Sequence, residues 1–388
     1  MFDFDTIIER RHTDSVKYDR VKAEFGYDDV LPMWVADMDF QSPPAVVSAL
    51  QDFCRQGVFG YTFRSAEGIE AFQSWVERRY GWLTKKEWIS SSPGIVTALS
   101  LAVRALTQPK EKVMIMTPVY PPFYSVVREN GRELVCSPLK RDQDGYVMDW
   151  DNLEEGLKSG VRLLILCNSH NPIGRVWTRE ELERLGNLCC RYDVLILSDE
   201  IHADLALFEH QHTVMASISE EIAARTLTAM APSKTFNIAG MINSIIVASN
   251  PDILKKYNKE LFALHLDLGN VMGHVALKAA YLHGEEWLNA MLKYLESNIN
   301  VALDYFRQEL PEIRIDRPEG SFLLWLDFNK TGYSHEECGN LLLKRGKIAL
   351  NDGLSFGDEG RGFFRMNIGC PQSVMLDGLE RINKALKG

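Results

Sequence analysis

Six short runs of almost uninterrupted apolar residues constrain the fold of this chain most. They cover residues 113–118, 134–138, 161–168, 194–198, 226–232 and 243–249. Apolar and polar residues do not alternate within these runs, which is typical of strands that are buried on both faces. Helical periodicity separates the runs. The sequence therefore predicts an α/β domain in which a mostly parallel sheet has helices on both faces.

A second, smaller domain is predicted from the C-terminal part of the chain. With 388 residues, the chain is long enough for two domains. A long amphipathic helical pattern follows Gly284, and three predicted strands lie between residues 314 and 369 before a C-terminal helix over residues 374–387. We expect a large domain over residues 45–284. The smaller α+β domain would combine residues 1–44 with residues 285–388.

Composition excludes several classes of function. A net charge of −10 and a pI near 5.5 argue against binding to the phosphate backbone of nucleic acids. The sequence has no run of 18 apolar residues, and its acidic N-terminus does not resemble a signal peptide. Its seven scattered cysteines lack the spacing of a disulfide framework or a zinc site. We expect a cytoplasmic protein with reduced, mostly buried thiols, no metal, no membrane contact and a small-molecule ligand.

Four side chains that follow predicted strands are candidates for a ligand site. Each has a simple structural explanation, as part of a turn, a helix start or a solvated surface charge. However, ligands of open α/β sheets lie at the carboxyl ends of the strands, and these four residues all occupy such ends. They are Tyr120, Asn171, Asp199 and Lys234. Their joint placement predicts one site.

This set of side chains suits pyridoxal 5′-phosphate better than other cofactors. Lys234 would bind the aldehyde as a Schiff base, Asp199 would keep the pyridine nitrogen protonated, and an aromatic side chain would stack on the ring. The phosphate needs donors, and a predicted helix begins after Ser92-Pro93 with free N–H groups at its start. Gly94 allows a close backbone approach, and Ser233 adds a hydroxyl.

The chain resembles the fold-type I pyridoxal-phosphate enzymes, the aspartate aminotransferase superfamily, over essentially its whole length. Six segments also resemble the cystathionine β-lyase, or carbon-sulfur β-lyase, branch of that superfamily. They are MWVADMDF (33–40), YTFRS (61–65), CNSHNPIGRVW (167–177), SDEIHADL (198–205), SKTFNIAG (233–240) and PEGSFLLWLDF (318–328).

The resemblance implies roles for individual residues around the cofactor. Lys234 is implied as the Schiff-base lysine and Asp199 as the partner of the pyridine nitrogen. Asn171 is implied to donate to the phenolic oxygen, and Tyr120 to stack on the ring. The implied phosphate ligands are Gly94, Ile95, Val96 and Ser233, together with Tyr61 from the neighbouring subunit of a homodimer with shared active sites.

The resemblance also implies a site for an amino-acid substrate. Arg365, in the segment FFRMNIG, is expected to bind the substrate α-carboxylate in a bidentate manner. Asn171, Tyr61 and Ala36 are expected beside it. Each of these roles is inferred from the match of one residue to one position of a family motif.

Two positions depart from the pattern of many transaminases. His202 replaces the tyrosine found three residues after the aspartate, so an imidazole would stand where a phenol often tunes the cofactor. Ile242 replaces the arginine that often binds the phosphate eight residues after the lysine. Phosphate binding would then depend more on backbone donors, Ser233 and Tyr61.

The branch motifs favour a carbon-sulfur β-lyase. Such an enzyme cleaves L-cystathionine or another S-substituted cysteine by α,β-elimination to a thiol, pyruvate and ammonia, with the freed amine of Lys234 as general base. An aminotransferase of class I/II uses the same residues and is the alternative. A second alternative is a cofactor-binding regulator with weak catalysis. The preferred sulfur amino acid does not follow from the sequence.

Overall fold

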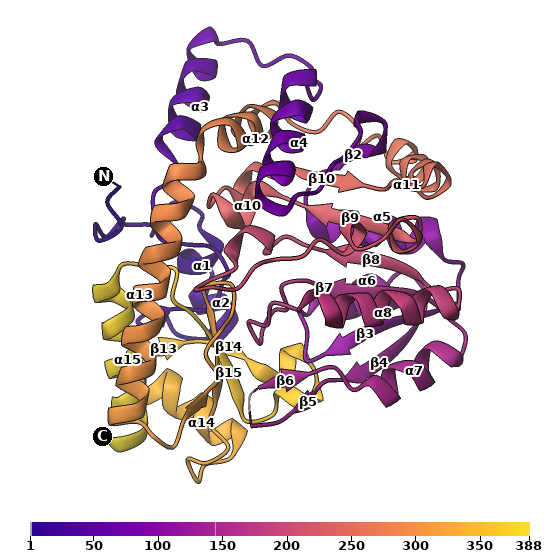
Figure 1. Ribbon diagram of the computed structural model, residues 1–388. Helices are drawn as coiled ribbons and strands as arrows, with labels where there is room; N and C mark the ends of the chain where they lie inside the picture. The colour runs from indigo at the N-terminus through magenta and orange to yellow at the C-terminus, as the bar shows by residue number, and fades with distance from the viewer. Residues whose placement is uncertain (1, 144) are drawn as a thin grey trace.

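A seven-stranded sheet forms the centre of the molecule. The computed structural model describes residues 2–143 and 145–388. The strands of this sheet follow one another as β2 (Ile89–Ser92), β10 (Ser244–Val247), β9 (Thr226–Met230), β8 (Leu195–Asp199), β7 (Val161–Cys167), β3 (Lys112–Thr117) and β4 (Glu133–Pro138) (Figure 1). Each of the six predicted runs overlaps one of these strands, with ends that differ by at most two residues. The predicted α/β fold with a mostly parallel sheet is confirmed.

Helices cover both faces of this sheet. The helices on one face are α5 (Ile95–Leu106), α6 (Pro122–Arg128) and α11 (Pro251–Ala263), and those on the other are α7 (Trp150–Lys158) and α8 (Arg179–Arg191). Val113 and Ile115 of β3 belong to the first of these cores, whereas Met114 and Met116 belong to the second. A strand between two cores has no face left for polar residues, which explains its continuous apolar sequence.

One strand of the sheet is antiparallel, as a mostly parallel sheet allows, and two details of the sequence prediction are wrong. β10 runs antiparallel to both β9 and β2, while the other pairs are parallel. The expected burial of residues 134–138 on both faces is wrong, because β4 is an edge strand in which Cys136 and Pro138 are exposed. β9 ends at Met230, short of the predicted residue 232, because Pro232 begins the short helix α10 (Pro232–Thr235).

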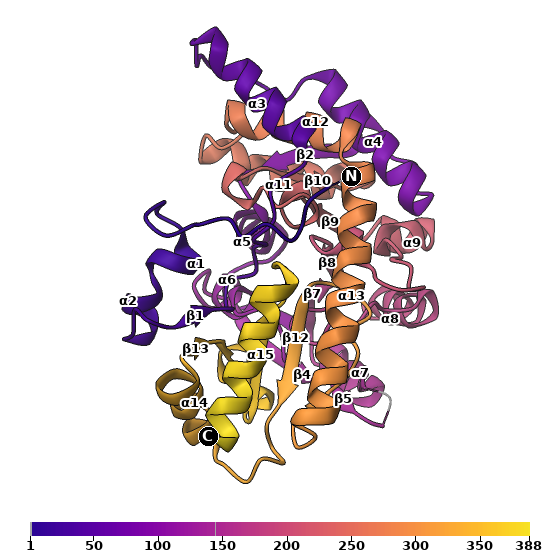
Figure 2. The same cartoon turned by 90° about the vertical axis from the view of Figure 1, so that its left-hand side faces the viewer.

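The C-terminal part of the chain forms a second sheet. Its four antiparallel strands follow one another as β11 (Arg314–Ile315), β12 (Leu323–Asp327), β15 (Phe363–Asn367) and β14 (Asn351–Asp352). The helices around it are α13 (Glu285–Glu309), α14 (His335–Leu341) and α15 (Gln372–Lys387). In Figures 1 and 2, α13 runs along one side of the molecule, from the large sheet to the small sheet.

The N-terminal segment joins this C-terminal part. Leu31–Pro32 (β1) pairs in parallel with Ile348–Ala349 (β13), next to the short helices α1 (Val16–Asp19) and α2 (Val21–Phe25) (Figure 2). This pairing supports the expected union of residues 1–44 with residues 285–388, although the domain boundaries stay a prediction. The predicted strand over residues 346–350 therefore contributes to this separate two-stranded sheet, and not to the four-stranded one.

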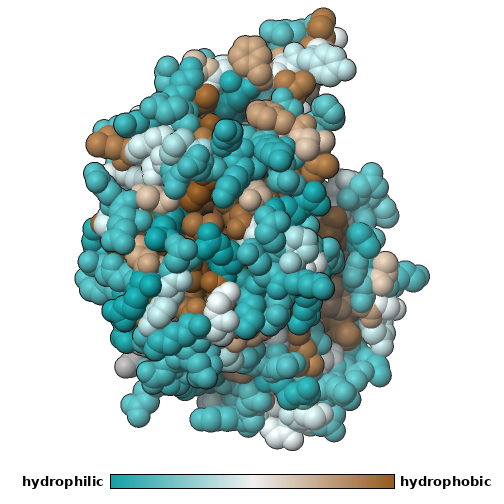
Figure 3. All heavy atoms as spheres, turned by 90° about the vertical axis from the view of Figure 1, so that its right-hand side faces the viewer, coloured by the Kyte–Doolittle hydropathy of each residue, from teal (hydrophilic) through white to brown (hydrophobic). Residues whose placement is uncertain are grey.

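The remaining elements lie mostly around the large sheet. They are α3 (Pro44–Gln56), α4 (Ala66–Tyr80), α9 (Glu220–Ala223), α12 (Val271–His283) and the small hairpin of β5 (Lys140–Arg141) with β6 (Tyr146–Val147). Among the described residues, no helix is both long enough and apolar enough to span a membrane. Figure 3 shows the face at the amino ends of the parallel strands. Hydrophilic side chains cover most of it, and hydrophobic ones form strips between them.

Candidate active site

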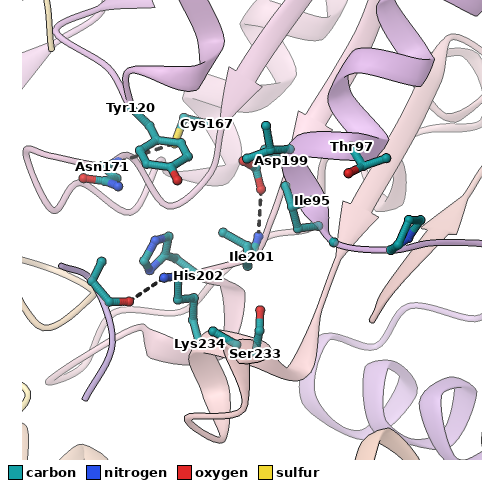
Figure 4. Close-up of a pocket in the computed structure, with 15 residues that line it drawn as sticks. Ile95, Thr97, Tyr120, Cys167, Asn171, Asp199, Ile201, His202, Ser233 and Lys234 are labelled. Atoms are coloured by element: carbon teal, nitrogen blue, oxygen red, sulfur yellow. Dashed lines mark hydrogen bonds between the residues drawn. The ribbon is translucent and has the colours of Figure 1, made fainter. Parts of the chain in front are cut away.

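A cavity of about 300 Å³ lies at the carboxyl ends of the parallel strands. All predicted site residues except Tyr61 and Arg365 line it, so residues from six separate chain segments meet at this cavity (Figure 4). The lining consists of Ala36, Pro93, Gly94, Ile95, Val96, Thr97, Tyr120, Cys167, Asn171, Asp199, Ile201, His202, Ser233, Lys234 and Ala239.

The start of helix α5 forms one wall of the cavity. Gly94 precedes the helix with φ at 94° and ψ at 158°, a conformation that strains any other residue. Ile95 and Val96 follow as the first helical residues. The N–H groups of a first helical turn have no acceptor within the helix, and the helix dipole makes this end positive. This wall can therefore bind an anion.

Asp199 ends strand β8 and is almost completely buried. Its carboxylate accepts a hydrogen bond from the N–H of Ile201 at 3.2 Å (Figure 4). Desolvation raises the pKa of Asp199 to about 7, although this hydrogen bond and the nearby Lys234 oppose the rise. A buried carboxylate with such a pKa is poised to pair with a cationic group in the cavity.

Lys234 enters the cavity from α10 and contacts the N-terminal segment. Its Nζ donates a hydrogen bond to the carbonyl oxygen of Ala36. Desolvation lowers the pKa of Lys234 to about 8, so that a large fraction of the amine is neutral at slightly alkaline pH. Asn237 fixes the segment around Ala36, because its amide donates to the carbonyl oxygens of Met38 at 2.9 Å and Phe40 at 2.7 Å.

Tyr120 and Asn171 stand together at the opposite side of the cavity (Figure 4). The N–H of Tyr120 donates to the carbonyl oxygen of Asn171 at 3.1 Å, which couples the turns after β3 and β7. His202 is buried nearby, and its Nδ1 has no hydrogen-bond partner among residues 2–143 and 145–388. Desolvation lowers the pKa of His202 to about 3, so this imidazole is neutral.

Arg365 lies behind Asn171 and does not line the cavity itself. It projects from β15, is 4% exposed, and donates through Nη1 to Oδ1 of Asn171 at 3.0 Å. Its Nη2 donates to the carbonyl oxygen of Trp34 at 2.9 Å. The Nε atom is buried without an acceptor in the described part of the chain. Arg365 thus connects the small sheet, the N-terminal segment and the cavity wall.

Tyr61, unlike Arg365, does not even border the cavity wall of its own chain. It lies in the loop between α3 and α4 and is 98% exposed. Ile242 is half exposed beside Gly94, so no cationic side chain stands at the position where the sequence pattern of transaminases has an arginine.

Sequence reasoning missed five residues of the lining. They are Pro93, Thr97, Cys167, Ile201 and Ala239. Cys167 is the last residue of β7, and Ile201 follows Asp199 by two positions. Cys167 and Ile201 could have been predicted, because both lie at or just after the carboxyl end of a predicted strand. Thr97 lacked one, because its place depends on how the first turn of α5 faces the cavity.

Comparisons with known proteins agree with this architecture. Residues 28–382 match the family model for aminotransferases of class I and II. The chain is 44% identical to the cystathionine beta-lyase PatB of Bacillus subtilis over 386 residues, which cover 99% of both chains.

Two solved structures with bound pyridoxal phosphate are similar over the whole chain. A putative aminotransferase from Clostridium difficile has a TM-score of 0.98 and 43% identity, with full coverage of both chains. A C-S lyase from Staphylococcus hominis has a TM-score of 0.93 and 33% identity, covering 100% of this chain and 99% of the other. The chain therefore belongs to the class I and II aminotransferase family, in the branch of that family that contains cystathionine β-lyases.

Proposed function

We propose that this protein is a pyridoxal-phosphate-dependent carbon-sulfur β-lyase. The observation that carries the proposal is the meeting of Lys234, Asp199, Asn171 and Tyr120 around one cavity beside the start of α5. The likeness to a cystathionine β-lyase and to a C-S lyase over nearly the whole chain favours this activity over other reactions of the superfamily.

The residues of the cavity fit the cofactor on three counts. Lys234 offers an amine whose lowered pKa suits covalent attachment to an aldehyde. Asp199 offers a buried carboxylate that a protonated ring nitrogen would neutralise. Gly94, Ile95 and Val96, with Ser233 opposite, offer donors for a phosphate. Tyr120 would cover one face of the ring.

When bound, pyridoxal 5′-phosphate supplies an electron sink that makes the substrate Cα proton acidic. Lys234 would then accept this proton at Nζ, since its neutral amine is the basic group in the cavity. Asp199 would hold the ring nitrogen in its protonated form. The C–S bond breaks with its electron pair on sulfur, so that a thiolate leaves, and hydrolysis of the remaining three-carbon fragment gives pyruvate and ammonia.

Arg365 is the proposed binding group for the substrate carboxylate. Its Nη1 already points to Asn171, and its Nε has no acceptor in the described part of the chain. A substrate carboxylate could satisfy the guanidinium if Arg365 moved slightly toward the cavity. Ala36 and Asn171 would border the same substrate.

The decisive experiment supplies L-cystathionine to the purified protein without a keto acid. We expect release of pyruvate and a free thiol in equal amounts. S-methylcysteine extends the test to a substrate with a small sulfur substituent, and Lys234→Ala is the inactive control. Turnover that requires an added keto acid would instead establish an aminotransferase, and cofactor binding without turnover of either kind would favour a regulator.

We also propose a homodimer with shared active sites in the cytoplasm. The loop before α4 exposes four large apolar side chains, which a second copy would cover: Val58, Phe59, Tyr61 and Phe63. Tyr61 would then reach the phosphate of the partner. The seven cysteines are all unpaired, which fits a reducing compartment.

A further inference from the structure

Arg64 joins the loop that contains Tyr61 to the edge of the central sheet. Its Nη1 donates to the carbonyl oxygen of Ser90 in β2 at 3.2 Å. Its Nη2 donates to the carbonyl oxygen of Ser244 in β10 at 2.9 Å and to the side-chain oxygen of Asn243. The Nε atom is buried and has no acceptor among residues 2–143 and 145–388.

The charge of Arg64 is not neutralised by any of these contacts. All three acceptors are uncharged oxygens, and no carboxylate within the described residues forms an ion pair with Arg64. Desolvation lowers the pKa of Arg64 to about 10, so the guanidinium remains cationic at neutral pH. A partly buried cation without a counter-ion is unfavourable unless an anion binds nearby.

Ser90 lies in β2, the strand that leads into α5, and Ser244 begins β10, which pairs with β2. Ser244 is the register partner of Ser92, which stands two residues before Gly94. Asn243 follows Ile242, whose Cγ2 lies 3.8 Å from the point where a Cβ on Gly94 would be. The guanidinium is therefore anchored to residues that adjoin Ser92 and Ile242, the two neighbours of the wall proposed to bind the phosphate.

This wall lacks a cation of its own. Two side chains of the cavity lining can carry a positive charge: His202, which is neutral because its pKa is lowered to about 3, and Lys234, which is assigned to the cofactor aldehyde. Ile242 provides none. A phosphate dianion would thus meet N–H groups and hydroxyls at the surface of the cavity, with Arg64 as the cation behind them.

We infer that Arg64 is a positioning residue that complements the charge of the cofactor phosphate through the Gly94–Val96 wall. It also fixes the loop of Tyr61 against the sheet through Ser90 and Ser244. The inference rests on the proposed binding of pyridoxal phosphate. It does not depend on which reaction follows.

The test compares two cofactor forms that differ by the phosphate alone. The full chain is stripped of cofactor, and its affinity for pyridoxal 5′-phosphate and for pyridoxal is measured by tryptophan fluorescence and visible absorbance. Arg64→Gln should weaken binding of pyridoxal 5′-phosphate about tenfold, or ~1.4 kcal/mol, but should change pyridoxal binding less than twofold. Arg64→Lys keeps the positive charge. This variant should therefore still bind pyridoxal 5′-phosphate more tightly than pyridoxal, by a ratio close to that of the wild type.

Arg132 offers a matched control. Its guanidinium also donates to neutral oxygens, those of Asn130, Thr107 and Arg104, but it stands at the other end of α5, ~18 Å from the phosphate wall for a 12-residue helix. Arg132→Gln should leave both affinities unchanged.

Equal loss of affinity for both ligands in Arg64→Gln and Arg64→Lys would overturn the inference, since it would indicate a purely structural role. Unchanged affinity for both ligands in Arg64→Gln would overturn it as well. A wild-type chain that binds neither ligand would contradict the proposed function itself. Because no amino-acid substrate is present, a failure of the lyase proposal leaves this test unaffected.

Discussion

The guanidinium of Arg365 donates to Oδ1 of Asn171 at 3.0 Å, although the two residues are 194 positions apart in the sequence. Arg365 stands on the small sheet, and Asn171 stands at the end of a strand of the large sheet. The contact joins the proposed carboxylate ligand to a proposed cofactor ligand. Substrate binding and cofactor orientation are therefore expected to be coupled.

The first prediction concerns this coupling. Arg365→Ala should raise KM about 100-fold, because a charge-assisted pair to a carboxylate contributes on the order of 3 kcal/mol, and should lower kcat much less. Asn171→Ala should also raise KM, since it releases Arg365 from its place. Steady-state kinetics of both single variants and the double variant measure the coupling. Additive effects in the double variant would contradict it.

The second prediction concerns Asp199 in the cofactor-free protein. Burial raises its pKa from 3.8 to about 7, so the native state binds a proton that the unfolded state has released between these pH values. The free energy of unfolding therefore falls as pH rises through this range, and the ionised carboxylate destabilises the fold above pH 7.

Asp199→Asn removes this ionisation. The cofactor-free variant should be more stable than wild type at pH 8, by up to ~4 kcal/mol, with a smaller difference at pH 5. Urea unfolding at both pH values measures this effect. With cofactor bound, the same variant should lose at least about 100-fold in kcat, because the ring nitrogen lacks its carboxylate. A variant of normal activity would remove the proposed role of Asp199.

The third prediction concerns His202. Its pKa is lowered to about 3, so the imidazole is neutral throughout the range from pH 5 to pH 9. His202→Gln should therefore reduce activity without moving the acidic limb of the profile of kcat/KM against pH. A limb that disappears in this variant would show that His202 ionises near neutral pH in the working enzyme.

The sequence predicted the sheet well where strands lie between two layers of helices, as β3 and β7 do. It did not predict β2, because the sequence Ile-Ser-Ser-Ser is polar and its strand is defined by pairing with β10. Site residues that depend on contacts with distant parts of the chain were likewise not predictable from local sequence. Asp199 and Lys234 follow strands and were recognisable, whereas Arg64 acts through contacts 26 to 180 residues away that no local pattern contains.

The last prediction concerns the proposed sharing of sites in a dimer. Tyr61 is 98% exposed in the single chain and lies outside the cavity, so it can serve as a phosphate ligand if it enters the site of a second copy. Lys234→Ala and Tyr61→Ala should each have low activity alone. When the two variants are unfolded together and reassembled, each heterodimer combines one intact site with one doubly damaged site.

Random pairing makes half of the dimers heterodimers, so roughly a quarter of the wild-type sites should be restored. Val16→Ala, a substitution of an exposed apolar residue outside the loop of Tyr61, should give no such gain when it replaces Tyr61→Ala in the mixture. The mixture of Lys234→Ala with Val16→Ala should have the fraction of wild-type activity that corresponds to the fraction of subunits with Lys234 intact. If heterodimers form but the mixture is no more active than the two parents, Tyr61 does not act across the interface.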